Sequence, residues 1–250
     1  MTDRPAPFDL GFPGPDFIRE RFGEIAEEAE ARDATLTDPG AFLLLGQVGR
    51  TLQELRVEDS GGADGLRTFG AFLFHAFHYD RVGRPHYRLE KGAARYLVES
   101  DPVPEGWDRS LPEEAGYLQL PEHLFWTRPD PEGPAEAIDG IFWTTSVDSI
   151  SVLAITGMRG DRAGFSVIPL PPVPLADAGE WIHRKAREEG DDFETTLPGG
   201  ELDRLYSVET AGELLKLLAR ALGYIRTVPD AVHVDDGDSA RPLRIIRLVS

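Results

Sequence analysis

Apolar residues dominate the middle of the chain, from residue 117 to residue 175, and short turn segments interrupt them. Within each run the apolar residues alternate with polar ones or follow one another directly, which is typical of strands in a buried sheet. We therefore expect a mostly antiparallel sheet as the core of the protein. The predicted strands cover residues 117–127, 140–145, 150–158 and 165–170.

The first 100 residues have the apolar spacing of helices instead. A helix is predicted over 16–32, with Asp16 as its N-cap. A second begins at Asp38-Pro39, with proline in its first turn, and ends at the Ser60-Gly61-Gly62 break. Residues 66–79 are apolar on most sides, which indicates a buried helix, and a fourth helix is expected over 88–98.

The rest of the chain predicts helices at 176–189 and 208–225, the latter capped by Ser207, and a final strand at 243–249. The predicted fold is α+β, with an N-terminal helical layer packed on the sheet, later helices and a C-terminal strand. Residues 1–15 are expected to form an extended lead-in. Residues 16–250 are expected to form a single domain, with a helical part at 16–100 and the sheet and later helices at 115–250.

The chain is strongly acidic, with 44 acidic and 26 basic residues and a net charge of −18. Such a surface repels nucleic acid and anionic membranes, so neither is an expected direct partner. The charge could instead attract a basic protein segment, mimic nucleic acid or simply maintain solubility. There is no cysteine, no run of apolar residues long enough for a membrane span, and no signal-peptide pattern, so a cytoplasmic protein is expected.

One local cluster could bind a metal ion. His75, His78 and Asp80 lie within one predicted helix and just beyond it, and imidazoles three residues apart can supply two ligands. A third imidazole would have to come from elsewhere, for example His86 or His123. The alternative is a partly buried histidine pair that is hydrogen-bonded inside the helical layer. Because no catalytic motif stands out, we expect no cofactor and no enzyme activity, and the sequence carries no signal for an oligomeric state.

Four aromatic residues of the predicted sheet are the candidates for partner binding: Tyr117, Trp126, Phe142 and Trp143. Aromatic side chains dominate the binding energy of protein interfaces. Strand alternation places Phe142 and Trp143 on opposite faces, so at most one of these two can face a ligand. The alternative is that the tryptophans pack in the core.

The order of several motifs resembles the type V-A anti-CRISPR family that blocks biogenesis of its target nuclease, together with bacterial and phage homologues. The resemblance covers about residues 66–230 and depends on the ordered set, because no motif is specific alone. The matching segments are 74–78 (FHAFH), 86–89 (HYRL), 116–126 (GYLQLPEHLFW), 139–143 (DGIFW), 166–171 (SVIPLP) and the late helix at 217–229.

The resemblance implies a non-enzymatic protein that needs no cofactor and binds a polypeptide segment or a nascent chain. This chain differs from the family in its greater acidity and in lacking a long basic C-terminal tail, so contact with RNA is not implied. The partner expected on this basis is a protein or peptide. A metal-dependent enzyme or sensor using His75, His78 and Asp80, or an acidic mimic of nucleic acid, are the alternatives.

Overall fold

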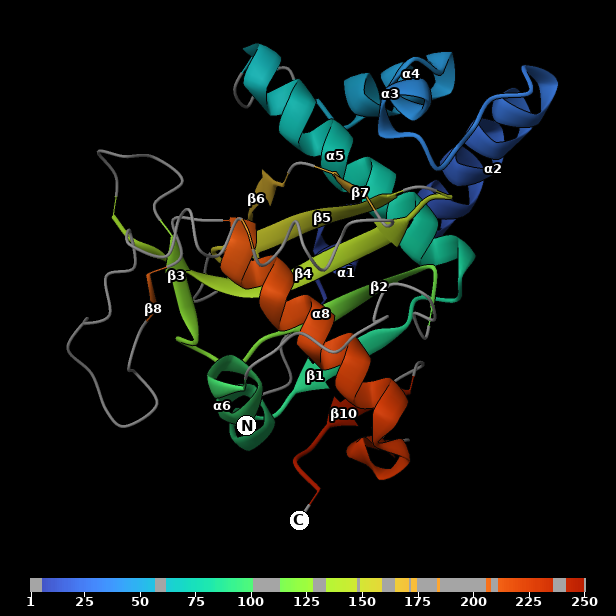
Figure 1. Cartoon of the computed structure of the whole chain (residues 1–250). Coiled ribbons are helices and arrows are strands. Elements are labelled where there is room, and N and C mark those ends of the chain that lie inside the picture. Colours follow the sequence, from blue (N-terminus) through green and yellow to red (C-terminus); the bar gives the residue numbers. More distant parts are fainter. Residues whose placement is uncertain are drawn as a thin grey trace.

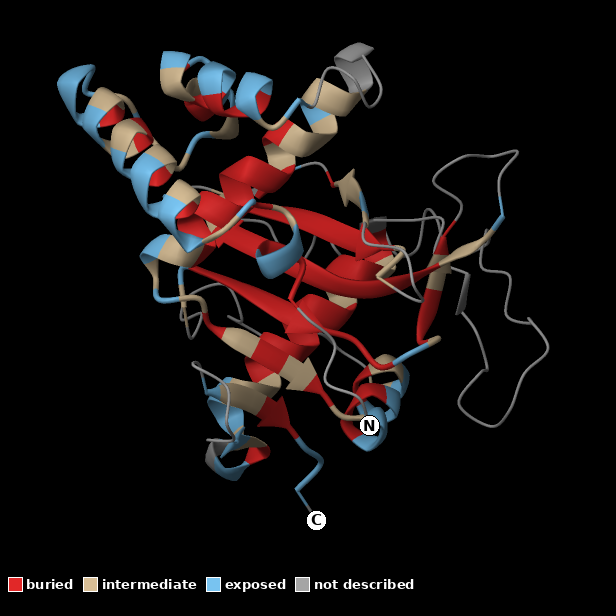
Figure 2. Cartoon of the chain, turned by 180° about the vertical axis from the view of Figure 1, so that it is seen from behind, coloured by how far each residue is buried: buried red, intermediate tan, exposed pale blue. Residues whose placement is uncertain are grey.

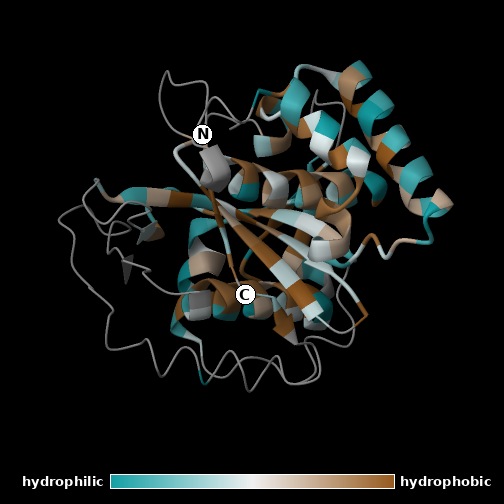
Figure 3. Cartoon of the chain, turned by 90° about the horizontal axis from the view of Figure 1, so that it is seen from above, coloured by the Kyte–Doolittle hydropathy of each residue, from teal (hydrophilic) through white to brown (hydrophobic). Residues whose placement is uncertain are grey.

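Helices cover both faces of one central sheet (Figures 1 and 3). This arrangement comes from a computed structural model. It describes residues 6–56, 62–100, 113–127, 134–147, 149–158, 165–170, 172–174, 184, 206–207, 211–235 and 242–249.

The sheet is mixed, and most neighbouring strands in it are antiparallel, as the sequence predicts. The strand at His86–Leu89 is the exception along the main path, because it runs parallel to both of its neighbours. Off this path, β3 (Phe125–Thr127) pairs with β4 and with β8 (Tyr206–Ser207), and β7 (Val173–Pro174) pairs with β5. The main order is β6 (Ser166–Pro169), β5 (Ser149–Thr156), β4 (Glu136–Thr145), β2 (Ala115–Gln119), β1 (His86–Leu89), β10 (Leu243–Ile246) and β9 (Val232–Asp235).

The helices divide between the two faces of the sheet. Within the described part of the chain, none of them is both long and apolar enough to cross a membrane. On one face lie α1 (Pro7–Leu10), α2 (Pro15–Ala31), α3 (Pro39–Leu43), α4 (Gly46–Glu54) and α5 (Gly62–Arg81); on the other lie α6 (Lys91–Glu99) and α8 (Ala211–Thr227), which is followed by η4 (Pro229–Ala231).

The central strands are buried on both faces (Figure 2). Alternate residues of each strand face opposite layers. Tyr117 and Phe142 pack with the rings of α5, whereas Leu118 and Trp143 belong to the core beneath α6 and α8. This confirms the expected opposite orientation of Phe142 and Trp143, and it explains why these strands have almost continuous apolar runs.

Two predicted elements in the region of the sheet differ from the structure. The segment 117–127 divides into β2 and β3, and residues 86–89 form the strand β1 instead of starting a helix at 88. β1 alternates half-buried and buried residues, and it is paired with β2 on one side and β10 on the other. The helix predicted there begins only at Lys91. Pairing with distant strands therefore overrides the local helical pattern.

The N-terminal part also departs from the expectation. Within the predicted extended lead-in, residues 7–10 form α1, because Phe8 is completely buried and packs against Tyr79, with 5.6 Å between ring centroids. The N-cap of α2 is Gly14, and Asp16 lies in its first turn. The predicted helix at 176–189 lies outside the described residues except for residue 184.

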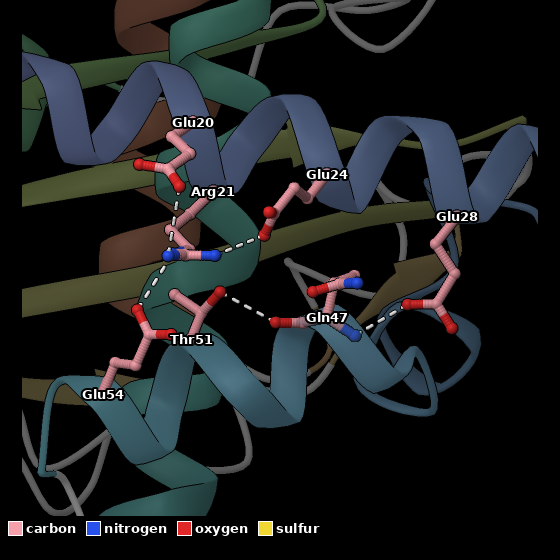
Figure 4. A network of polar contacts seen from close by, with 7 residues as sticks. All are labelled: Glu20, Arg21, Glu24, Glu28, Gln47, Thr51 and Glu54. Atoms are coloured by element: carbon pink, nitrogen blue, oxygen red, sulfur yellow. Dashed lines mark hydrogen bonds and ion pairs between the residues drawn. The ribbon is translucent and has the colours of Figure 1, made fainter.

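The second predicted helix is broken into α3 and α4, and a carboxylate from α2 caps the second of these (Figure 4). Glu28 accepts hydrogen bonds from the backbone N–H groups of Gly46 and Gln47, at 3.0 and 2.7 Å. The bond from Gln47 is the main reason that the pKa of Glu28 is lowered. Arg21 adds a second link, because it forms ion pairs with Glu24 on α2 and Glu54 on α4. These contacts fix the position of α2.

Two glycines give opposite predictions for stability. A Cβ at Gly116 would lie 2.3 Å from the indole of Trp143, which is buried and has no room to move, whereas a Cβ at Gly49 on α4 would meet no atom within 4 Å. We expect Gly116→Ala to lower the free energy of unfolding by about 1–3 kcal/mol. Gly49→Ala should raise it by up to about 1 kcal/mol, because alanine favours the helix. Urea unfolding measures both, and equal effects would contradict the packing described here.

Candidate functional site

Three of the four aromatic residues predicted to bind a partner are core residues. Tyr117, Phe142 and Trp143 are each no more than 2% exposed. The rings of Tyr117 and Phe142 pack against each other with centroids 4.6 Å apart, and the indole N–H of Trp143 donates to the backbone carbonyl of Glu113. In this structure these rings offer no surface to a partner.

Trp126 is different, because it is only partly buried and lies on the short strand β3. Its ring packs beside His123, with 5.3 Å between centroids. Its indole Nε1 is buried and has no hydrogen-bond partner among the described residues. Of the four predicted aromatic contacts, Trp126 is the one that stays available as a candidate.

The predicted metal ligands point toward different partners. His75 Nδ1 lies 2.9 Å from the hydroxyl of Thr144, and His78 Nε2 donates to the backbone carbonyl of Leu36 at 3.0 Å. Asp80 forms an ion pair with Arg84. Among the described residues, no three His, Asp or Glu side chains are placed to hold a metal ion. Both histidines are hydrogen-bonded, as the alternative expects, but they are buried and not partly buried, and the partner of His75 lies on β4 of the sheet and not in the helical layer.

Burial controls the protonation of both histidines. Desolvation lowers the pKa of His75 to about 3. It also lowers the pKa of His78 to about 4, although the hydrogen bond to the Leu36 carbonyl acts in the opposite direction. Both imidazoles are therefore neutral near pH 7 and serve the packing of α5 against its surroundings.

The surface between α2 and the C-terminal end of α5 contains two adjoining hollows, with volumes of about 350 and 360 Å³. Both are lined by Ala26 and Arg81, so they lie next to each other, and we name the two together the α2–α5 groove. The first hollow is lined by Pro15, Ile18, Arg19, Phe22, Gly23, Ala26, Phe77, Asp80, Arg81 and Arg84. The second is lined by Ala26, Ala29, Glu30, Asp33, Ala34, Leu36 and Arg81.

The groove exists because small residues lie where α2 faces α5. A Cβ at Gly23 would meet no atom within 4 Å, and Ala26 adds only a methyl group. The buried ring of Phe22, one helical turn before Ala26, contacts Phe77 of α5, with 5.4 Å between the ring centroids. Phe22 and Phe77 thus join α2 to α5 beneath the groove, while Gly23 and Ala26 leave the space above them open.

Arg84 is held in place at one end of the groove. Gly83 lies two residues after the end of α5 and has a φ of 82°. Arg84 has a φ of 60°, which is unfavourable for a residue other than glycine. The backbone N–H of Arg84 donates to the carbonyl of Tyr79 at 2.8 Å. Its guanidinium forms an ion pair with Asp80 and lies 4.3 Å from the ring centroid of Phe8. These contacts maintain a strained backbone and fix the direction of the side chain.

Two more arginines line the same end. The Arg81 guanidinium lies 5.6 Å from the centroid of Phe77, and in the described part of the chain no carboxylate forms an ion pair with it. Arg19 pairs with Asp16 at 2.7 Å, but both side chains are highly exposed, so this ion pair contributes little. A protein with a net charge of −18 thus gathers three cationic groups above an apolar floor.

Sequence reasoning missed these arginines, because they belong to α2, to α5 and to the turn after α5. Two signals could have indicated them. Gly83-Arg84-Pro85 leaves an arginine between two turn-forming residues. Gly23 in the middle of a helix costs stability unless the space beside it is used, so it suggests a packing or functional reason.

The buried histidines predict how stability depends on pH. Because both pKa values lie below the ordinary 6.5, the unfolded chain binds more protons than the folded chain between about pH 6.5 and 4. The free energy of unfolding should therefore fall with decreasing pH, by up to about 1.4 kcal/mol per pH unit for each histidine. Urea unfolding should show a shallower pH dependence for His75→Gln and His78→Gln than for the wild type. His233→Gln, on the exposed strand β9, is the matched control. Identical slopes in all four proteins would contradict the assignment.

Comparison with known proteins gives a distant structural similarity. No protein-family model matches the chain, and no curated protein matches it. A crystal structure of AcrVA2, an anti-CRISPR protein, is similar to this chain with a TM-score of 0.49 and 13% sequence identity. The similarity covers 86% of this chain and 66% of AcrVA2. The chain therefore spans just under two thirds of the length of that protein.

Proposed function

We propose that this protein is a non-enzymatic binding module that holds a polypeptide segment of another protein in the α2–α5 groove. The observation that carries the proposal is the combination, in one groove, of an apolar floor and arginine side chains. The floor is formed by Ile18 and Phe22, each 5% exposed, above the completely buried ring of Phe77, and the arginines are Arg19, Arg81 and Arg84. Aromatic and arginine side chains around a depression are typical of the residues that dominate the energy of protein interfaces.

The length of the groove favours a chain segment over a small anion. Its lining extends along α2 from Pro15 to Glu30. At 1.5 Å per residue of helix this distance is roughly 20 Å. An extended polypeptide of about six residues covers the same length. A small anion would contact the arginines at one end and leave the rest of the groove empty.

The fixed position of Arg84 supports tight binding. Its side chain is already held by Asp80 and by the ring of Phe8, so less conformational entropy is lost when a partner binds. The ordered sequence motifs that resemble the anti-CRISPR family point to the same class of partner, since that resemblance implies recognition of a polypeptide. No reaction is needed to explain any residue of the groove.

Filling the groove tests this function. We expect Gly23→Leu to block the space between α2 and α5 without lowering stability, because the new side chain points into open space and leucine favours the helix. The matched control is Gly49→Leu, on α4 outside the groove, which also has open space around it. A displayed library of random peptides about twelve residues long, roughly twice the groove, would be selected on the wild-type protein.

The affinities of the selected peptides would be measured by fluorescence polarisation. We expect the affinity to fall by roughly tenfold or more for Gly23→Leu and to be unchanged for Gly49→Leu. If no peptide is selected, or if the selected peptides bind both variants as well as the wild type, the groove is not a polypeptide site.

A further inference from the structure

The charges of the α2–α5 groove are divided between its two hollows. Arg19 and Arg84 line the first hollow together with Asp80, the ion-pair partner of Arg84, and Glu30 and Asp33 line the second. Arg81 lies between them, since it lines both. The groove is therefore positive at one end and negative at the other, with the apolar floor at the positive end and the alanines of α2 and the following turn at the negative end.

The two carboxylates of the second hollow have no cationic partner among the described residues, unlike other acids of the same helix. Glu24 pairs with Arg21, and Glu28 pairs with Arg32 and also caps α4. Glu30 and Asp33 are both exposed and form no ion pair in the described part of the chain. Their negative charge is not used to hold the fold together.

The position of these carboxylates is unfavourable for the helix itself. α2 ends at Ala31, and the C-terminal end of a helix carries a partial negative charge. The turn that follows fixes Asp33 in place: its φ is 51°, its N–H donates to the Glu30 carbonyl, and the N–H of Ala34 donates to the Ala29 carbonyl. Two carboxylates at this end repel the helix dipole and each other. A cation brought by a partner would relieve both repulsions.

Resting on the function proposed above, we infer that the occupant of the groove is a segment with opposite charges at its two ends. An acidic side chain binds at Arg19 and Arg84, and a basic side chain binds at Glu30 and Asp33. Arg19 and Glu30 are separated by roughly 16 Å along α2. The acidic and basic residues of the segment are therefore about five positions apart in an extended chain. Apolar side chains between them lie over Ile18 and Phe22.

Charge reversal at each end tests this inference with the same displayed library of random peptides. On the wild type, we expect the selected peptides to carry an acidic and a basic residue about five positions apart. Glu30→Lys should shift the selection toward peptides with acidic residues at both ends, and Arg19→Glu should shift it toward peptides with basic residues at both ends. Each reversal should weaken a wild-type peptide roughly threefold or more, and the loss should diminish at high salt.

Two matched controls make the same kinds of charge reversal at residues outside the groove. Glu27→Lys lies on α2, and Arg67→Glu lies on α5; both residues are exposed and line neither hollow. Neither control should alter the charges of the selected peptides. A change in the controls equal to that in Glu30→Lys or Arg19→Glu would show that overall charge, not the groove, determines the selection, and would overturn the inference.

The outcome also separates this inference from the proposed function. If the selected peptides lose affinity for Gly23→Leu but show no preferred charges, the groove binds polypeptides and the charge assignment is wrong. If no selected peptide depends on Gly23, the groove does not bind polypeptides, and the proposed function and the charge assignment are both rejected.

Discussion

Burial of the central strands on both faces is the constraint on which the rest of this structure depends. Every side chain of β4 from Ala137 to Thr144 is buried, so the sheet needs a helical layer on each side. α5 provides the centre of one layer, and α6 and α8 provide the other. Because Phe72, His75 and Tyr79 pack α5 against the sheet, the C-terminal end of the helix is fixed. The positions of Arg81 and Arg84, which line the groove, are fixed with it.

Two other kinds of contact hold α2 in place: polar contacts with α4 and packing of aromatic rings with α5. The Glu28 carboxylate caps α4, and Arg21 joins α2 to α4 (Figure 4). Phe22 packs on Phe77 of α5. The groove therefore lies between α5, which the core holds in place, and α2, which the contacts of Glu28 and Arg21 with α4 hold in place. Binding sites built between rigid elements need little rearrangement, which favours affinity. Gly23 and Ala26 leave the space that such a site requires.

The net charge of the chain does not describe this site. At physiological ionic strength charges are screened over about 8 Å, so a partner in contact with the surface responds to the nearest groups. In the groove those groups are Arg19 and Arg84 at one end, Arg81 between the two hollows, and Glu30 and Asp33 at the other end. The buried histidines of α5 add a separate dependence on pH, which acts on the stability of the fold.

The sequence by itself determined the elements whose pattern is local: the strands around 140–145 and 150–158, the apolar helix α5, and the opposite directions of Phe142 and Trp143, because alternation is a property of a single strand. Only the tertiary structure decided that β1 is a strand, since its partner β10 lies at the far end of the chain. It also decided that Tyr117, Phe142 and Trp143 are buried, because helices from other parts of the chain cover both faces. The groove could not be predicted either, since the spacing between α2 and α5 depends on how two helices pack and not on the sequence of one.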